Sequence, residues 1–165
     1  MLSLTKKTEY ALIALGYLSE HPGKTVAARE VAEAHGMPGP LLMNILKTLH
    51  HAGLIASTRG TKGGYRLTAD LAAVSLHRLI EVIEGPVYLA ECAAPQPAEC
   101  APGPDGVCQR PRCRVRGSCP IAGPVLALHH RFVGLLDDVK LADLLGGGGR
   151  KQVRPEFYAT TATGP

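Results

Sequence analysis

Apolar residues recur at helical spacing in three segments near the start of the chain. The spacing predicts helices over about Lys6–Glu20, Ala27–His35 and Leu41–Ala52. Thr5 is suited to the N-cap of the first helix, and Gly36 follows the second at a position where glycine adopts positive φ easily. The inward stripe of the third helix consists of Leu42, Ile45, Leu46 and Leu49.

The second and third segments form a pair joined by a short turn that contains glycine. In the second helix we expect Val31 and Ala34 to face the core. After the pair, Leu54–Arg59 is a predicted strand, Gly60–Gly64 a hairpin tip and Tyr65–Thr68 the returning strand. A preceding helix, a helix pair and then a hairpin indicate a winged helix-turn-helix. A generic helical domain with an incidental hairpin is the alternative.

Two further helices are predicted beyond the hairpin. One runs from the Ser75 cap to Glu84, and a longer one covers about Ile121–Asp137. Apolar residues of the longer helix alternate at spacings of three and four, as in a coiled-coil seam. Since one seam is buried only against a partner, we expect a homodimer; packing against the chain's own domain is the alternative. The seam residues are Val125, Leu128, Phe132 and Leu135.

These elements predict a mainly α fold with a small β-hairpin wing: a winged helix-turn-helix domain plus a long dimerisation helix. We assign residues 1–85 to the winged helix-turn-helix DNA-binding domain and 86–120 to a cysteine-rich, cluster-binding loop. Residues 121–145 hold the dimerisation helix. Residues 146–165 begin with four glycines and continue as a polar tail, which we expect to be disordered.

All five cysteines lie between residues 92 and 119, where proline and glycine rule out a helical or strand period. Cys108, Cys113 and Cys119 are separated by four and five residues, directly before the long helix. Soft thiolates on a loop that can wrap an inorganic core suit an iron–sulfur cluster. Structural zinc usually takes paired knuckles, which only Cys108 and Cys113 approach, so zinc is less favoured. The same spacing is also compatible with redox thiols or with an inert loop.

Composition permits nucleic-acid binding without demonstrating it, because the net charge is +4 with a pI near 8.9. The chain has no apolar run of membrane-spanning length and no signal peptide, so we expect a cytoplasmic protein that does not associate with a membrane. Free thiols and metal clusters persist in that compartment. No nucleotide loop, nucleophile triad or paired-carboxylate site is visible, so we do not expect an enzyme.

Candidate contacts to double-stranded DNA lie on the wing and on two helices. Arginine on a narrow wing suits insertion into the minor groove, and asparagine on the third helix can pair with adenine. Lysine and arginine elsewhere are candidate phosphate contacts, or simply a solvated basic face. The candidates are Arg59 and Lys62 on the wing, Asn44 on the third helix, and Lys6, Lys7, Lys47 and Arg66 for phosphates.

A resemblance to a known family rests on the run ILKTLHHAGLIASTRGTKGGYRLT followed by VSLHRLIEVIEG. These segments resemble the Rrf-two family of bacterial winged-helix regulators, of the IscR and NsrR type, and the likeness extends from Leu4 to about Leu145. The resemblance implies a dimeric repressor or activator that binds an operator. Several members carry a 2Fe–2S or 4Fe–4S cluster on three cysteines just before the dimerisation helix.

The resemblance also suggests a ligand set for the cluster. Cys113 and Cys119 match the family pattern, whereas Cys108 is one residue closer than is common, and Cys100 is a possible substitute. One branch of the family takes its fourth ligand from a carboxylate in the first helix of the other subunit, and Glu9 stands at that position. Without the resemblance, Glu9 is simply a favourable charge in a first helical turn.

The sequence therefore leaves two hypotheses. One is a dimeric transcriptional regulator whose operator binding is controlled by an iron–sulfur cluster sensing redox state, nitric oxide or iron. The second is a zinc- or thiol-based metal or redox accessory protein that uses the winged helix for protein contacts. An arginine on the wing favours the first, since a protein-contact wing does not need it.

Overall fold

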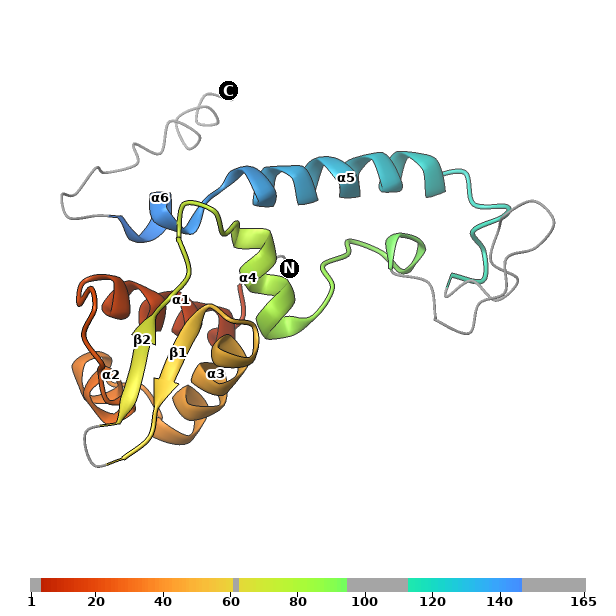
Figure 1. Cartoon of the computed structure of the whole chain (residues 1–165). Coiled ribbons are helices and arrows are strands. Elements are labelled where there is room, and N and C mark those ends of the chain that lie inside the picture. The colour runs from red at the N-terminus through yellow and green to blue at the C-terminus, as the bar shows by residue number, and fades with distance from the viewer. Residues whose placement is uncertain (1–3, 61–62, 95–112, 147–165) are drawn as a thin grey trace, which may run out of the picture.

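Helices dominate the chain, and one hairpin accompanies them (Figure 1). The computed structural model describes residues 4–60, 63–94 and 113–146. Its helices are α1 Lys6–Ser19, α2 Ala28–His35, α3 Gly39–His51, α4 Leu76–Glu84, α5 Ala122–Asp138 and α6 Leu141–Leu145, with a short 3-10 turn, η1, at Glu91–Ala93. Its strands are β1 Ile55–Thr58 and β2 Gly64–Leu67. The predicted mainly α fold with a hairpin wing is confirmed.

The core lies between α1, α3 and α4. Thr5 caps α1 as predicted, accepting a hydrogen bond from the Thr8 amide at 3.3 Å. The predicted α3 stripe is buried throughout and packs against Leu15 and Leu18 of α1. Burying a leucine of this kind contributes about 1.5–3 kcal/mol, so the stripe fixes how α3 sits on α1. The opposite face of α3 is left for contacts outside the domain.

The turn between α2 and α3 differs in one detail from the prediction. Gly36 ends α2 with a φ of 62°, as expected for a glycine at this position. Val31 is buried, but Ala34 is exposed, and Met37 takes the inward position instead. The Met37 amide donates to the Ala32 carbonyl at 2.9 Å, which folds the chain back after the helix and carries the Met37 side chain into the core.

The hairpin is antiparallel, with Ile55 opposite Leu67 and Thr58 opposite Gly64. A third segment pairs with it, since Val26 and Tyr65 exchange two backbone hydrogen bonds of 2.8 Å. This pairing anchors the wing to the segment that precedes α2. A side chain at Gly64 would collide with the Val26 carbonyl, so this close approach requires glycine.

The C-terminal helices return to the winged helix. Leu76 donates its amide to the Val139 carbonyl at 2.8 Å, and the Leu141 amide donates to the Val74 carbonyl at 2.9 Å. Leu141 is fully buried in the same core as α1. The C-terminal end of α5 is thus fixed beside α4, while its N-terminal end extends away from the domain (Figure 1).

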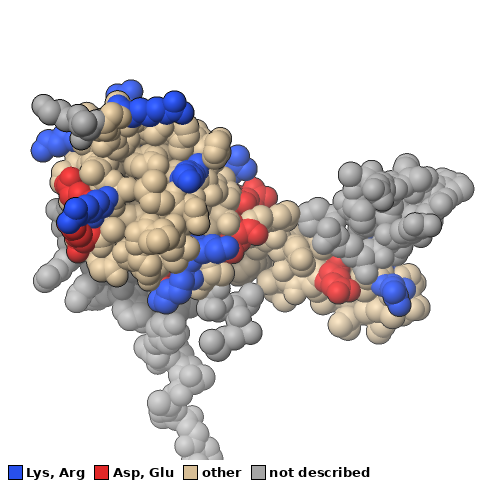
Figure 2. Space-filling model, turned by 90° about the horizontal axis from the view of Figure 1, so that it is seen from below, with Lys and Arg blue, Asp and Glu red and all other residues tan. Residues whose placement is uncertain are grey.

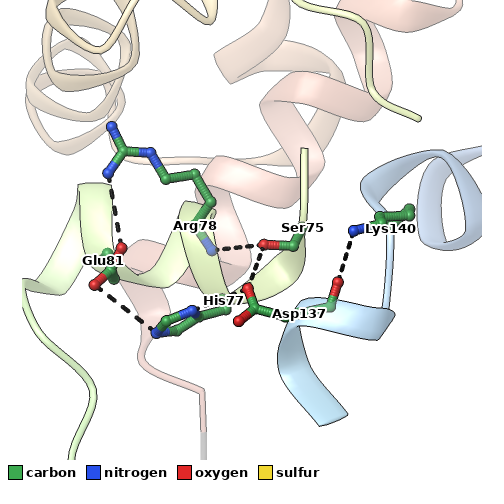
Figure 3. Close-up of polar contacts among 6 residues, drawn as sticks. All are labelled: Ser75, His77, Arg78, Glu81, Asp137 and Lys140. Atoms are coloured by element: carbon green, nitrogen blue, oxygen red, sulfur yellow. Dashed lines mark hydrogen bonds and ion pairs between the residues drawn. The ribbon is translucent and has the colours of Figure 1, made fainter. Parts of the chain in front are cut away.

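Side chains reinforce this junction (Figure 3). The Asp137 carboxylate accepts hydrogen bonds of 3.0 Å from the Ser75 hydroxyl and from Nδ1 of His77. Ser75 is also the N-cap of α4, and it accepts from the Arg78 amide. The Lys140 ammonium donates to the Asp137 carbonyl at 2.8 Å. Among the described residues, no helix is long and apolar enough to cross a membrane.

Candidate nucleic-acid interface and cysteine segment

The outward face of α3 is polar and basic. Asn44, Lys47 and His51 follow one another at spacings of three and four, so they lie along one side of the helix, and all three are exposed. Their stripe is opposite the buried leucines. A helix-turn-helix presents its second helix to the major groove in this way.

On one side of α3, a groove separates the helix from the hairpin. Its volume is about 420 Å³. The groove brings together two predicted contact residues, Lys47 from α3 and Arg59 from the end of β1. The complete lining is Lys47, His50, His51, Ser57, Thr58, Arg59, Gly64 and Tyr65.

On the other side of α3, a smaller cavity of about 170 Å³ joins α3 to the start of α1. Lys7 and Asn44 both line it, together with Thr48. The structure therefore brings Lys7 of α1 beside Asn44 of α3, the helix that is expected to enter the major groove. Figure 2, which looks onto the face carrying α2, α3 and the hairpin, shows Lys and Arg side chains around a largely uncharged centre, with Asp and Glu side chains at two edges.

The remaining predicted DNA contacts do not line either of these two cavities or lie outside the described residues. Arg66 is exposed on β2 but lines neither cavity. Lys6 is exposed and bound to Glu9, with 2.5 Å between Nζ and Oε2. The hydrogen bond and the negative charge of Glu9 raise the pKa of Lys6 above its ordinary value. Lys62 lies outside the described residues.

Two of the predicted cluster cysteines are described. Cys113 and Cys119 are half-buried free thiols that flank a series of tight turns. The Cys113 carbonyl accepts from Arg116 at 3.4 Å, and the Cys119 carbonyl accepts from Ala122 at 3.3 Å, at the very start of α5. Cys92 is a third free thiol, on η1, which packs against α5. Cys100 and Cys108 lie outside the described residues.

Glu9 is not near these thiols within one chain. It lies in the first turn of α1, whereas Cys113 and Cys119 lie beyond the far end of α5 (Figure 1). Among the described residues, no three His, Cys, Asp or Glu side chains are grouped closely enough to hold a metal ion. Soft thiolates of Cys113 and Cys119 are chemically suited to an iron–sulfur cluster, but they supply only two ligands.

The predicted seam on α5 is divided between two environments. Leu128 and Leu135 are 58% and 61% exposed, which is unusual for leucines spaced seven residues apart on one helix. Phe132 is half-buried, and it lines an apolar cavity of about 300 Å³ together with residues of α1 and α4. Val125 is half-buried as well. The chain's own domain therefore covers one edge of the seam and leaves the opposite edge open.

His50 and His51 line the groove although neither was among the predicted contact residues. His51 follows Asn44 by seven residues and Lys47 by four, so the helical period alone could have placed it on the same face. The position of His50 depends instead on the hairpin, because its Nε2 lies 3.2 Å from the Ser57 hydroxyl of β1. No local pattern signals that contact.

Comparison with known proteins gives a consistent result. Residues 4–147 match the Rrf2 family model, described as an iron-dependent transcriptional regulator. The chain is 30% identical over 152 residues to an rrf2-like HTH-type regulator protein of Rhodobacter capsulatus, which covers 88% of this chain and 93% of that protein. It is 28% identical over 146 residues to the HTH-type transcriptional repressor NsrR of Streptomyces coelicolor, covering 87% and 88%. The solved structure of IscR from T. potens has a TM-score of 0.61 at 23% identity, covering 99% of this chain and 94% of that one.

Proposed function

The chain belongs to the Rrf2 family of transcriptional regulators, and from this membership we propose that it is a DNA-binding regulator that acts as a homodimer. We further propose that an iron–sulfur cluster on the cysteine segment controls its binding to an operator. Each part of the proposal draws on a different region of the molecule, and the parts are separable by experiment.

The observation that carries DNA binding is the outward face of α3 between its two cavities. Asn44 is the residue we propose to read base edges. Lys7 lines the cavity on one side of α3, and Lys47 and Arg59 line the groove on the other. Phosphate contacts of this kind fix the protein on the duplex without reading sequence, and the base contact supplies specificity. Lys6, Lys62 and Arg66 are proposed as further phosphate contacts at the margin.

The exposed leucines of α5 support a dimer. Leu128 and Leu135 lie on a part of the helix that the chain's own domain leaves uncovered. Burying both against a second copy would remove apolar surface from water, at about 25 cal/mol per Å². A two-fold axis that relates two copies of α5 would also bring two wings to one duplex, and a palindromic operator matches that symmetry.

The cluster would be held by Cys108, Cys113 and Cys119, with Cys100 as a substitute and Glu9 of the partner subunit as the fourth ligand. The donor chemistry of the described thiols supports this, since both sulfurs are free and both cysteines lie at the ends of the turns that lead into α5. Glu9 is free to change partners, because its ion pair with Lys6 is on the surface and such pairs are weak.

When bound, the cluster supplies a link between the loop and the partner's α1 that is sensitive to redox state, nitric oxide or iron supply. Cys119 is joined through its carbonyl to the first turn of α5, so a change in the loop reaches the dimerisation helix. The two wings would then change their spacing, and half-site geometry is strict enough for a small shift to alter affinity.

The test compares the wild type with Cys119→Ala after purification without oxygen. An operator is first obtained by selecting tightly bound duplexes from a random-sequence pool. We expect the wild type to show the visible absorption of an iron–sulfur cluster, and Cys119→Ala to lose it and to change its operator affinity at least tenfold. Ser118→Ala, a neighbour in the same turn, is the matched control and should behave as the wild type.

Two results would contradict parts of the proposal. An unchanged spectrum or an unchanged operator affinity in Cys119→Ala would remove the cysteine segment from the switch. A colourless wild type containing zinc would favour the metal or thiol accessory protein instead. Absence of any duplex binding at low salt would reject DNA binding itself.

A further inference from the structure

The groove between α3 and the hairpin contains two histidines that the proposed mode of DNA binding does not use. We propose that His50 and His51, together with Lys47 and Arg59, form a phosphate-binding site for the DNA backbone, and that protonation of the two histidines makes DNA affinity rise as pH falls. This inference rests on the proposed DNA-binding function and adds its regulation by protons.

The two histidines lie together in the groove. Their ring centroids are 5.8 Å apart with the rings nearly edge-to-face, and both residues line the groove of about 420 Å³. His50 is held toward the hairpin by its 3.2 Å contact with the Ser57 hydroxyl. Both residues are exposed, so solvent protons and an incoming phosphate reach them directly.

The charges of the groove are all of one sign. Its titratable lining residues are Lys47, His50 and His51 from α3, Arg59 after β1 and Tyr65 from β2. None of the described residues that line it is acidic. A protonated histidine here therefore has no carboxylate in the groove to neutralise it, and an anion from outside is the natural counter-charge.

The C-terminal end of α3 repels an anion because the helix dipole gives it partial negative charge, and this charge is smaller than the side-chain charges of the groove. The C-terminal end of a helix carries about half a negative elementary charge. Lys47 and Arg59 carry two full positive charges, which outweigh it. Two protonated histidines would raise the total to four.

The short distance between the His50 and His51 rings couples protonation of these histidines to phosphate binding. Placing two positive charges about 6 Å apart is unfavourable on its own. A phosphate that contacts both rings would offset that repulsion, so phosphate binding and proton uptake would favour each other. Histidine is the side chain whose ordinary pKa allows this uptake between about pH 5 and 8.

The experiment measures binding of the full chain to a random-sequence duplex by fluorescence anisotropy, at pH 6 and pH 8 and at several salt concentrations. A random duplex is chosen because phosphate contacts are independent of sequence. We expect wild-type affinity to be about tenfold higher at pH 6, since each bound proton can contribute up to tenfold per pH unit. The slope of log affinity against log salt should steepen by about one to two at pH 6.

Variants separate the histidines from the permanent charges. His50→Gln combined with His51→Gln should bind equally at both pH values, at the wild-type level of pH 8. Lys47→Gln should lose affinity at both pH values and keep the pH dependence. His130→Gln, an exposed histidine on α5, controls for histidines elsewhere and should match the wild type. Thermal unfolding of each variant verifies that it folds.

The outcomes distinguish this inference from the function on which it rests. Wild-type binding that is independent of pH, or a double variant that keeps the full pH dependence, overturns the inference and leaves DNA binding intact. A wild type that binds no duplex at low salt overturns both.

Discussion

At the scale of single residues, Gly64 shows how tightly the wing is built. The structure brings β2 so close to Val26 that a Cβ at Gly64 would meet the Val26 carbonyl oxygen and carbon. Because those atoms are backbone, and the Val26–Tyr65 hydrogen bonds hold them in place, they cannot move away without breaking the pairing.

We therefore expect Gly64→Ala to lower the free energy of unfolding by about 1–3 kcal/mol, the usual cost of forcing an extra methyl into a packed site. Urea denaturation measures this. Gly123→Ala is the matched control, because nothing lies within 4 Å of a Cβ there and alanine favours a helix. Equal stability of Gly64→Ala and wild type would mean that the wing is not anchored at Val26.

At the scale of elements, the contact between α4 and α5 depends on Asp137. Partial burial raises the pKa of Asp137. Hydrogen bonds from Ser75 and His77, together with the positive charges of His77 and Lys140, lower the pKa by more than burial raises it. The net result is a pKa below the ordinary value of 3.8. The folded state thus favours the charged carboxylate. Its contribution to stability is fully present above the unfolded-state pKa, and it is lost as pH falls through the lower folded-state pKa.

Asp137→Asn should accordingly lower the free energy of unfolding at pH 7 by about 1 kcal/mol, a low figure for charged hydrogen bonds because half of the carboxylate is exposed. As pH falls below the ordinary carboxylate pKa of 3.8, the variant and the wild type should converge. Urea titrations at a series of pH values measure this, and Asp138→Asn is the neighbouring control. A difference that stays constant down to about pH 2 would argue against a role for the charge.

Elements were predictable from sequence where their signals are local. Thr5 and Ser75 cap helices, Gly36 ends one, and the apolar period of α3 identifies its buried face; all of these depend on residues a few positions apart. The Asp137–Ser75 hydrogen bond spans 62 residues, and no short pattern encodes it.

The same reason explains what sequence analysis missed or misplaced. Pairing of Val26 with Tyr65 and the contact of His50 with Ser57 exist only after the hairpin has folded against α3. The error at Ala34 arose because helical spacing was extended to the end of α2, where the turn brings Met37 inward instead. Most basic and polar residues of the candidate site could therefore be predicted from the sequence. The groove could not, because it forms only where α3 and the hairpin pack together.

At the scale of the whole molecule, the winged helix and α5 form a domain with one projecting arm. Leu128 and Leu135 are exposed on that arm, whereas Phe132 also contacts the cavity shared with α1 and α4. A charge at Phe132 would therefore disturb the chain's own packing as well as any interface. A charge at Leu135 tests the interface alone, because the side chain is already in solvent in the single chain.

We expect the wild type to be a dimer at micromolar concentration and Leu135→Asp to be a folded monomer. An aspartate at this position would bring an unpaired charge into an apolar contact, which costs far more than the lost leucine area. Light scattering measures the mass, and circular dichroism verifies the fold. His130→Asp, an exposed residue on another side of α5, should stay dimeric. If the monomer kept wild-type affinity for a palindromic operator, each half-site would be bound independently, and α5 could not transmit a signal from the cysteine segment to the spacing of the wings.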